Sequence, residues 1–168
     1  ERIMKVHHAH KPPEMLEKEK RYDPKERFTE KDMVLITYGD IIQGSGETPL
    51  SILYNFVNTY TRGAFNTIHL LPFFPYSSDR GFAVVDFRQV DPKLGSWDDI
   101  HEKKKTYDLM FDAVLNHVSS MSEMFLEFRN GNPRHLDYFI SYDSPDDLTA
   151  EQRKKLFRPR TSDILTRF

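Results

Sequence analysis

Three short stretches of the chain combine carboxylates, aromatic rings and hydrogen-bond donors in a way that suits a bound sugar. They are Tyr38 with Asp40, the segment 72–82 (PFFPYSSDRGF), and the group Asp112, Asn116 and His117. In a pyranose site a carboxylate accepts hydrogen bonds from two hydroxyls, and an aromatic ring covers the apolar C–H face of the sugar. Asp79 and Phe82 have these properties, and His117 can donate to a further hydroxyl. The residue types predict a polar and aromatic pocket, but not a complete catalytic set.

Each of these residues also has a structural interpretation. Asp79 can begin a turn and pair with Arg80, and a histidine directly after a strand, such as His117, is often structural. Phe82, like Phe73, is of a type that packs in a core more often than it stacks on a sugar ring. Asp112 lies inside a predicted strand, where we expect it to fix the neighbouring backbone rather than touch substrate. The pattern of residues alone leaves these alternatives open.

The elements that must position these groups alternate between strands and helices. Runs of β-branched, aromatic and other apolar residues predict strands at 34–38, 67–71 and 109–117, and helices are predicted to begin near Thr48 and Ser96. This order is typical of right-handed βαβ units and predicts a parallel sheet of the α/β class. Ligands of such sheets bind at the carboxyl ends of the strands, where all three stretches fall.

Both predicted helices carry start signals. Thr48 is an N-cap followed by proline, and Ser96 forms a capping box with Asp99. The second helix has a thin apolar face, with Lys104 at a position where an apolar residue is expected. The intervening segment 72–95 contains no predicted regular element, and loops of this length are usually functional.

The two ends of the chain differ in composition from this central part. Residues 1–32 are charged and lack apolar periodicity, so we expect a solvated N-terminal arm, in which His7, His8 and His10 are too few for a metal site. Beyond the third strand, 122–129 predicts a short helix, and a charged tail follows. Three parallel strands leave open edges, so we expect a truncated domain that is marginally stable or self-associates as a homo-oligomer.

Composition excludes several classes of protein. The 168 residues include 24 Lys and Arg against 26 Asp and Glu, for a net charge of -2, so nothing calls for a nucleic-acid or membrane partner. No apolar run approaches the roughly 18 residues of a membrane helix. The absence of cysteine excludes disulfides and thiolate chemistry, and we expect a cytoplasmic protein.

A set of ordered matches resembles one enzyme family. The hexapeptide DAVLNH at 112–117 resembles the first short signature of the α-amylase superfamily. Further segments resemble its sucrose phosphorylase branch: ITYGD at 36–40, HLLPFFP at 69–75, DRGF at 79–82, VDP at 90–92, LGSWDD at 94–99 and RPR at 158–160. The N-terminal arm, YGD and PYSS are more similar to the members that resemble glucosylglycerate phosphorylase.

This resemblance implies a partial (β/α)8 TIM barrel. Residues 1–32 would be an N-terminal arm, 33–120 the first part of the catalytic barrel with its first three strands and two helices, and 121–168 the start of a small insertion domain after strand three. In this family the nucleophile lies at strand four, the acid/base at strand five and a third carboxylate at strand seven. We therefore expect an N-terminal fragment with no catalytic residue, inactive on its own.

The implied activity is retaining transfer of a glucosyl unit from sucrose or glucosylglycerate to phosphate. Inorganic phosphate is the co-substrate, and no cofactor or metal is expected. Asp79 would hold the glucose 4- and 6-hydroxyls, Phe82 would stack on the ring, and His117 would bond the 6-hydroxyl. The residues expected to be structural near the site are Tyr38, Asp112 and Asn116. Two alternatives remain: another glucosidase or glucosyltransferase of the superfamily, or a non-catalytic sugar-binding protein.

Overall fold

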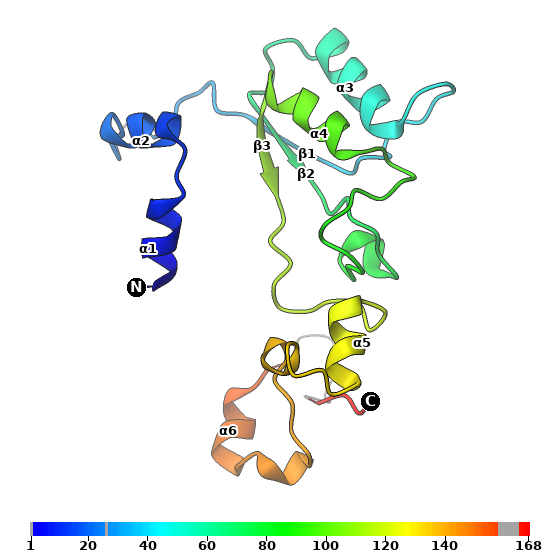
Figure 1. Ribbon diagram of the computed structural model, residues 1–168. Helices are drawn as coiled ribbons and strands as arrows, with labels where there is room; N and C mark the ends of the chain where they lie inside the picture. The colour runs from blue at the N-terminus through cyan, green and yellow to red at the C-terminus, as the bar shows by residue number, and fades with distance from the viewer. Residues whose placement is uncertain (1, 26, 158–164) are drawn as a thin grey trace. The chain divides into compact units, whose positions relative to one another are not determined.

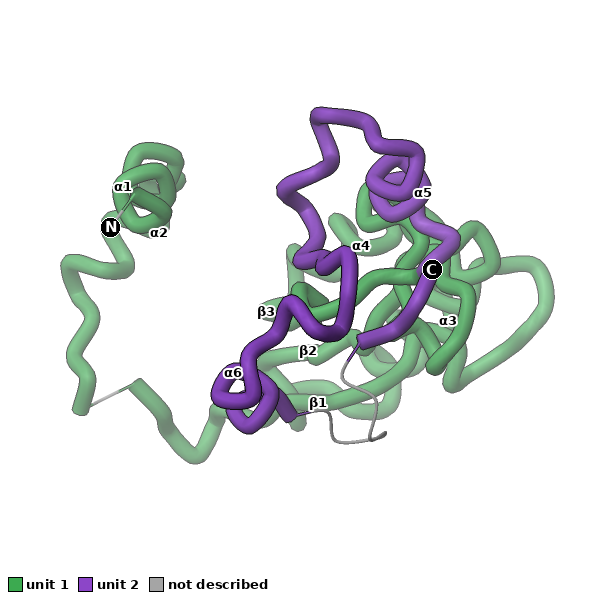
Figure 2. The backbone as a smooth tube through the Cα atoms, turned by 90° about the horizontal axis from the view of Figure 1, so that it is seen from below, with its two compact units in different colours: residues 1–119 green, residues 120–168 purple. Residues whose placement is uncertain are grey.

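The computed structural model describes residues 2–25, 27–157 and 165–168 (Figure 1). The chain divides into two compact units, Glu1–Ser119 and Ser120–Phe168, which Figure 2 distinguishes by colour. The first unit contains a parallel sheet and its covering helices. The second contains short helices and turns. The predicted RPR segment at 158–160 lies outside the described residues.

The sheet has three parallel strands in the order β1 (Val34–Thr37), β2 (Thr67–Leu70) and β3 (Asp108–Phe111). The register aligns Thr37 with Leu70 and Leu70 with Phe111, so the three carboxyl ends meet at one edge. The α/β class and the parallel arrangement predicted from the sequence are confirmed.

Two helices cover one face of this sheet, α3 (Pro49–Tyr60) and α4 (Trp97–Lys104) (Figure 1). The buried core joins three residues of α3 to β2 and α4: Leu50, Leu53, Val57, Ile68, Leu70 and Ile100. Both start signals are confirmed. The Thr48 hydroxyl accepts a hydrogen bond from the backbone N–H of Ser51 at 3.2 Å, and Asp99 accepts one from the Ser96 N–H at 2.8 Å.

The third strand was predicted at 109–117, and this extent is wrong. β3 ends at Phe111, so Asp112 lies beyond the strand rather than inside it. The cause lies in the neighbouring strand. β2 ends at Leu70, and Pro72, two residues later, has no N–H to donate to a longer ladder. A second difference concerns α4. The sequence pattern placed Lys104 on the apolar face of this helix, whereas in the structure Lys103 is buried and Lys104 is exposed.

The N-terminal arm contains two helices that its composition did not predict, α1 (Arg2–Ala9) and α2 (Pro13–Lys20). Neither helix buries a residue, which is why no apolar periodicity marks them in the sequence. Proline at the first position of α2 and lysines in its last turn are favourable helix-end residues.

The second unit begins with α5 (Glu123–Arg129), at the site of the predicted short helix. Its N-cap Ser122 accepts a hydrogen bond from the Phe125 N–H at 3.3 Å. A short aromatic cluster surrounds Phe125, and α6 (Ala150–Lys155) follows behind the N-cap Thr149. The sequence did not predict α6. Within the described ranges, no helix combines the length and apolar character needed to cross a membrane.

Candidate functional site

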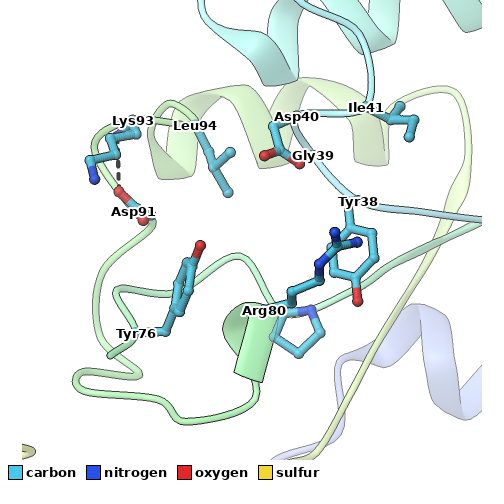
Figure 3. Close-up of a pocket in the computed structure, with 10 residues that line it drawn as sticks. Tyr38, Gly39, Asp40, Ile41, Tyr76, Arg80, Asp91, Lys93 and Leu94 are labelled. Carbon is cyan, nitrogen blue, oxygen red and sulfur yellow. Dashed lines mark hydrogen bonds between the residues drawn. The ribbon is translucent and has the colours of Figure 1, made fainter. Parts of the chain in front are cut away.

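A pocket of about 360 Å³ lies at the carboxyl ends of β1 and β2 (Figure 3). Its walls come from the segment after β1, the segment after β2 and the approach to α4. They are Tyr38, Gly39, Asp40 and Ile41, then Pro72, Tyr76 and Arg80, then Asp91, Lys93 and Leu94. This edge of the sheet is the one at which βα barrels bind their ligands. The pocket is therefore a candidate ligand site, with two tyrosine hydroxyls and side chains of both charges.

A tight turn with an unusual backbone overhangs the end of β2. Asp79, Arg80 and Gly81 have φ values of 56, 48 and 100°, so three successive residues lie in the left-handed region. Two of them carry a Cβ, and such conformations cost on the order of 1–3 kcal/mol each. The surrounding contacts must hold the turn in place. A Cβ added at Gly81 would lie 2.6 Å from the backbone oxygen of Pro72, so only glycine fits against the end of β2.

The turn is the tip of a small hairpin, although no regular element was predicted there. The backbone N–H of Ser77 donates to the carbonyl of Ala83 at 3.0 Å, and that of Val85 donates to Pro75 at 2.7 Å. Tyr76 and Val84 form an antiparallel bridge between the two arms. The hairpin thus holds Asp79 at a defined place above the sheet.

Two further hydrogen bonds join this hairpin to the segment that follows β3. The Ser119 N–H donates to the carbonyl of Val84 at 2.8 Å, and the hydroxyls of Ser77 and Ser119 are 2.7 Å apart. Ser77 is two residues before Asp79, and Ser119 is two residues after His117. The structure therefore links the segments that carry Asp79 and His117, two of the predicted substrate-binding residues.

The predicted site residues occupy different environments. Asp79 is exposed at the start of the turn, Phe82 is half-buried at its end, and His117 and Asn116 are exposed after β3. Of the six predicted site residues, only Tyr38 lines the pocket. Whether the other five contact a ligand stays a prediction.

The sequence did not single out Arg80 as a pocket residue. Arg80 lines the pocket with Tyr38 and Asp40, and in the view of Figure 3 its guanidinium lies over the ring of Tyr38. Asp79 does begin a turn, as its structural interpretation required, but Arg80 makes no ion pair with any described residue. The position of Arg80 after an aspartate, in a polar segment, was the one feature of the sequence that pointed to it. The left-handed backbone conformation that directs Arg80 into the pocket could not be predicted from the sequence.

Asp112 contacts the side chain of His69. The Asp112 Oδ2 and the His69 Nε2 are 3.1 Å apart, so the carboxylate meets a neighbouring strand rather than only fixing its own backbone. His69 alternates with Ile68 and Leu70, which are buried beneath α3. It therefore faces the opposite side of the sheet, in register with the exposed residues Ile36 and Met110. The pair occupies that open face at the carboxyl ends of β2 and β3.

Phe73 belongs to the core, as its structural interpretation predicted. It is 1% exposed, and the edge of its ring meets Trp97 and Phe111 at centroid distances of 5.7 and 5.0 Å. Trp97 in turn donates from its indole N–H to the carbonyl of Arg88 at 2.8 Å. Hydrogen bonds from Arg88 hold the pKa of Asp86 below its usual value. This packing fixes the loop between the pocket and α4.

A buried lysine lies on the inner face of α4. Lys103 is 3% exposed, donates to the carbonyl of Asp99 at 3.0 Å, and lies 5.3 Å from the ring of Tyr54. Burial lowers its pKa to about 8, because the charged amine loses its water. It lies among the core side chains of α3 and α4, so we assign it a structural role. No group of three or more potential metal ligands occurs in the part of the chain that the structure describes.

Comparison with known proteins identifies the family. Residues 62–160 match the description "Alpha amylase, catalytic domain". A glucosylglycerate phosphorylase from Allomeiothermus silvanus is 47% identical over 141 residues, which cover 84% of this chain and 24% of the relative. The chain belongs to the α-amylase family. A sucrose phosphorylase from Bifidobacterium adolescentis is 34% identical over 132 residues, which cover 75% of this chain and 26% of that enzyme.

Solved structures of this family share the same fold. The crystal structure of sucrose 6F-phosphate phosphorylase from Thermoanaerobacter thermosaccharolyticum matches with a TM-score of 0.68 and 30% identity, over 82% of this chain and 28% of that one. The sheet and its helices are part of the (β/α)8 barrel of the α-amylase family. The chain spans about a quarter of the length of the relatives it matches.

Proposed function

We propose that this chain forms the donor-glucose side of a retaining glucoside phosphorylase, which transfers a glucosyl unit from glucosylglycerate or sucrose to phosphate. Its relatives are phosphorylases of such glucosides. The observation that carries the proposal is the link between the Asp79 hairpin and the His117 segment at the carboxyl edge of the sheet. That link brings a carboxylate and an imidazole to the edge at which barrels of this type bind substrate.

Three residues bind the glucose, each through a different kind of contact. The Asp79 carboxylate accepts hydrogen bonds from the 4- and 6-hydroxyls, since an exposed carboxylate has up to four acceptor positions. The half-buried ring of Phe82 packs on the apolar face of the sugar. His117 donates to the 6-hydroxyl. Tyr38, Asp112 and Asn116 have structural roles near the site, and Asp112 exerts its role through the contact with His69.

The chemistry follows the retaining scheme of the family. An aspartate attacks the anomeric carbon while a glutamate protonates the leaving oxygen, and the two carboxylates of such a pair are about 5 Å apart. Phosphate then attacks the glucosyl–enzyme intermediate, the aspartate leaves, and glucose 1-phosphate is released. By family resemblance the aspartate belongs to strand four, the glutamate to strand five and a third carboxylate to strand seven, and residues 121–168 begin the insertion domain after strand three. The use of phosphate as the co-substrate stays a prediction, and so does the absence of a cofactor.

Two other functions compete with this proposal. Another enzyme of the superfamily would transfer the glucosyl unit to water or to a second sugar rather than to phosphate. A non-catalytic sugar-binding protein would bind glucosides without turnover, and the pocket beside Tyr38 and Arg80 gives it a candidate site.

The test uses the protein isolated from its source cell through an affinity tag on this chain. We expect glucose 1-phosphate to form from glucosylglycerate or sucrose only when phosphate is present. Release of free glucose at the same rate without phosphate would identify a hydrolase. Binding of the glucoside with no product under either condition would favour the non-catalytic alternative and overturn the proposal.

A further inference from the structure

The hydroxyl pair Ser77 and Ser119 joins two segments that are far apart in sequence. The two oxygens are 2.7 Å apart, although 42 residues separate them along the chain. Ser119 is 2% exposed, so its hydroxyl is shielded from water. A buried hydroxyl is costly to leave without a partner, and a polar group is retained in such a place where it has a specific contact. Neither residue lines the pocket or was predicted to bind substrate.

This contact connects the hairpin that carries Asp79 to the segment that carries His117. The hairpin itself is fixed by backbone hydrogen bonds between its two arms and by the fit of Gly81 against Pro72. Among the described residues, the segment after β3 forms no such ladder, since β3 already ends at Phe111. It is joined to the hairpin through the Ser119 N–H, which donates to the carbonyl of Val84, and through the hydroxyl pair. The position of His117 relative to Asp79 therefore depends on Ser119.

We propose that Ser77 and Ser119 are positioning residues that set the distance between Asp79 and His117, and so determine how selectively the site binds the glucose 6-hydroxyl. The proposal rests on the proposed function, in which both of those side chains contact that one hydroxyl. Two groups that share a ligand atom tolerate little relative movement, because a hydrogen bond weakens steeply with distance and angle. The backbone bond of Ser119 remains when its hydroxyl is removed, so a loosened link is expected rather than a lost segment.

The experiment that tests this proposal compares two glucosyl donors in the reverse reaction, the synthesis of the glucoside from glucose 1-phosphate. The source-cell protein is assayed with α-glucose 1-phosphate and with its 6-deoxy analogue, and the ratio of their kcat/KM values measures recognition of the 6-hydroxyl. Ser119→Ala is expected to lower this ratio roughly three- to tenfold, the scale of one hydrogen bond. Most of that loss should come from the natural donor. The neighbouring exposed Ser120→Ala serves as the control and should leave the ratio unchanged.

A second variant protects the test against misfolding of the first. Ser77 is exposed, so Ser77→Ala removes the same contact without disturbing a buried position, and it should lower the ratio by a similar factor. The double variant should lose no more than either single variant, because both remove one shared contact.

The outcomes separate this inference from the proposed function. A wild-type protein without turnover overturns the proposed function and this inference with it. An active wild type whose Ser77 and Ser119 variants lose rate equally with both donors would overturn the inference alone, since a purely structural role lowers both rates together. Additive effects in the double variant would also contradict it.

Discussion

Gly81 provides the sharpest test of how the hairpin is held over the sheet. In Gly81→Ala the new Cβ would lie 2.6 Å from the Pro72 oxygen and 3.1 Å from the Pro72 Cβ, at a φ of +100°. Backbone rather than a flexible side chain is the obstacle, so the turn itself must move. Gly46→Ala is a matched control, because Gly46 has a φ of +89° but nothing lies within 4 Å of its added Cβ.

The structure allows the two costs to be separated. An alanine in the left-handed region costs on the order of 1–3 kcal/mol, and this cost applies to both variants. The overlap with Pro72 adds about 1–3 kcal/mol, as overpacking of a close-fitting site usually does, and it applies to Gly81→Ala alone. We expect Gly81→Ala to lose about 2–6 kcal/mol in total and Gly46→Ala about 1–3 kcal/mol.

Urea unfolding of the two variants beside the wild type measures this difference directly, provided that the slope of free energy against urea concentration stays constant. Gly81→Ala should also raise the donor KM, because movement of the turn displaces Asp79, and Gly46→Ala should not. Equal losses of stability in the two variants would refute the claim that Pro72 forces glycine at this position.

Three further predictions concern the site and its supporting helices. Asp79→Asn should lower kcat/KM for phosphorolysis by about 100-fold or more, because hydrogen bonds from two hydroxyls to a charged group are lost; a wild-type value would remove Asp79 from the donor site. Lys103→Met should raise the free energy of unfolding at pH 7 by up to about 3 kcal/mol. The pKa of Lys103 in the folded protein is about 8, below the ordinary 10.5, so the free energy of unfolding of the wild type rises as the pH increases between these two values, and the stability advantage of Lys103→Met disappears. Lys104→Met is the exposed control. A stability advantage of Lys103→Met that does not change with pH would contradict the prediction. Asp99→Ala should lower the free energy of unfolding, measured by thermal unfolding, by about 1–2 kcal/mol, because it removes the capping box of α4 and a contact with the N-cap of α3. Asp98→Ala is the control and should lower it less. Equal losses of stability in the two variants would argue against the role of Asp99 in capping.

The features that the sequence predicted well are local ones. The N-caps at Thr48 and Ser96 and the apolar face of α3 are encoded within a few neighbouring residues, so the starts of both helices could be located. The family resemblance also rested on short contiguous segments, and the comparisons confirm it.

The features that could not be predicted depend on residues distant in sequence. The end of β3 is set by its neighbour β2 and by Pro72, so an apolar run up to Leu115 misled the prediction of its length. The pairing of His69 with Asp112 depends on the register of two strands. The left-handed backbone at Arg80 is rare for such a residue, and therefore its place in the pocket had no reliable signal.

A crystal structure of the source-cell protein with bound glucose is the most direct test of the account. We expect the sugar ring to pack on Phe82, with its 6-hydroxyl within about 3 Å of both the Asp79 carboxylate and the His117 imidazole. Glucose bound instead in the pocket between Tyr38 and Arg80, with neither Asp79 nor His117 in contact, would contradict the central claim that these two segments form the donor site.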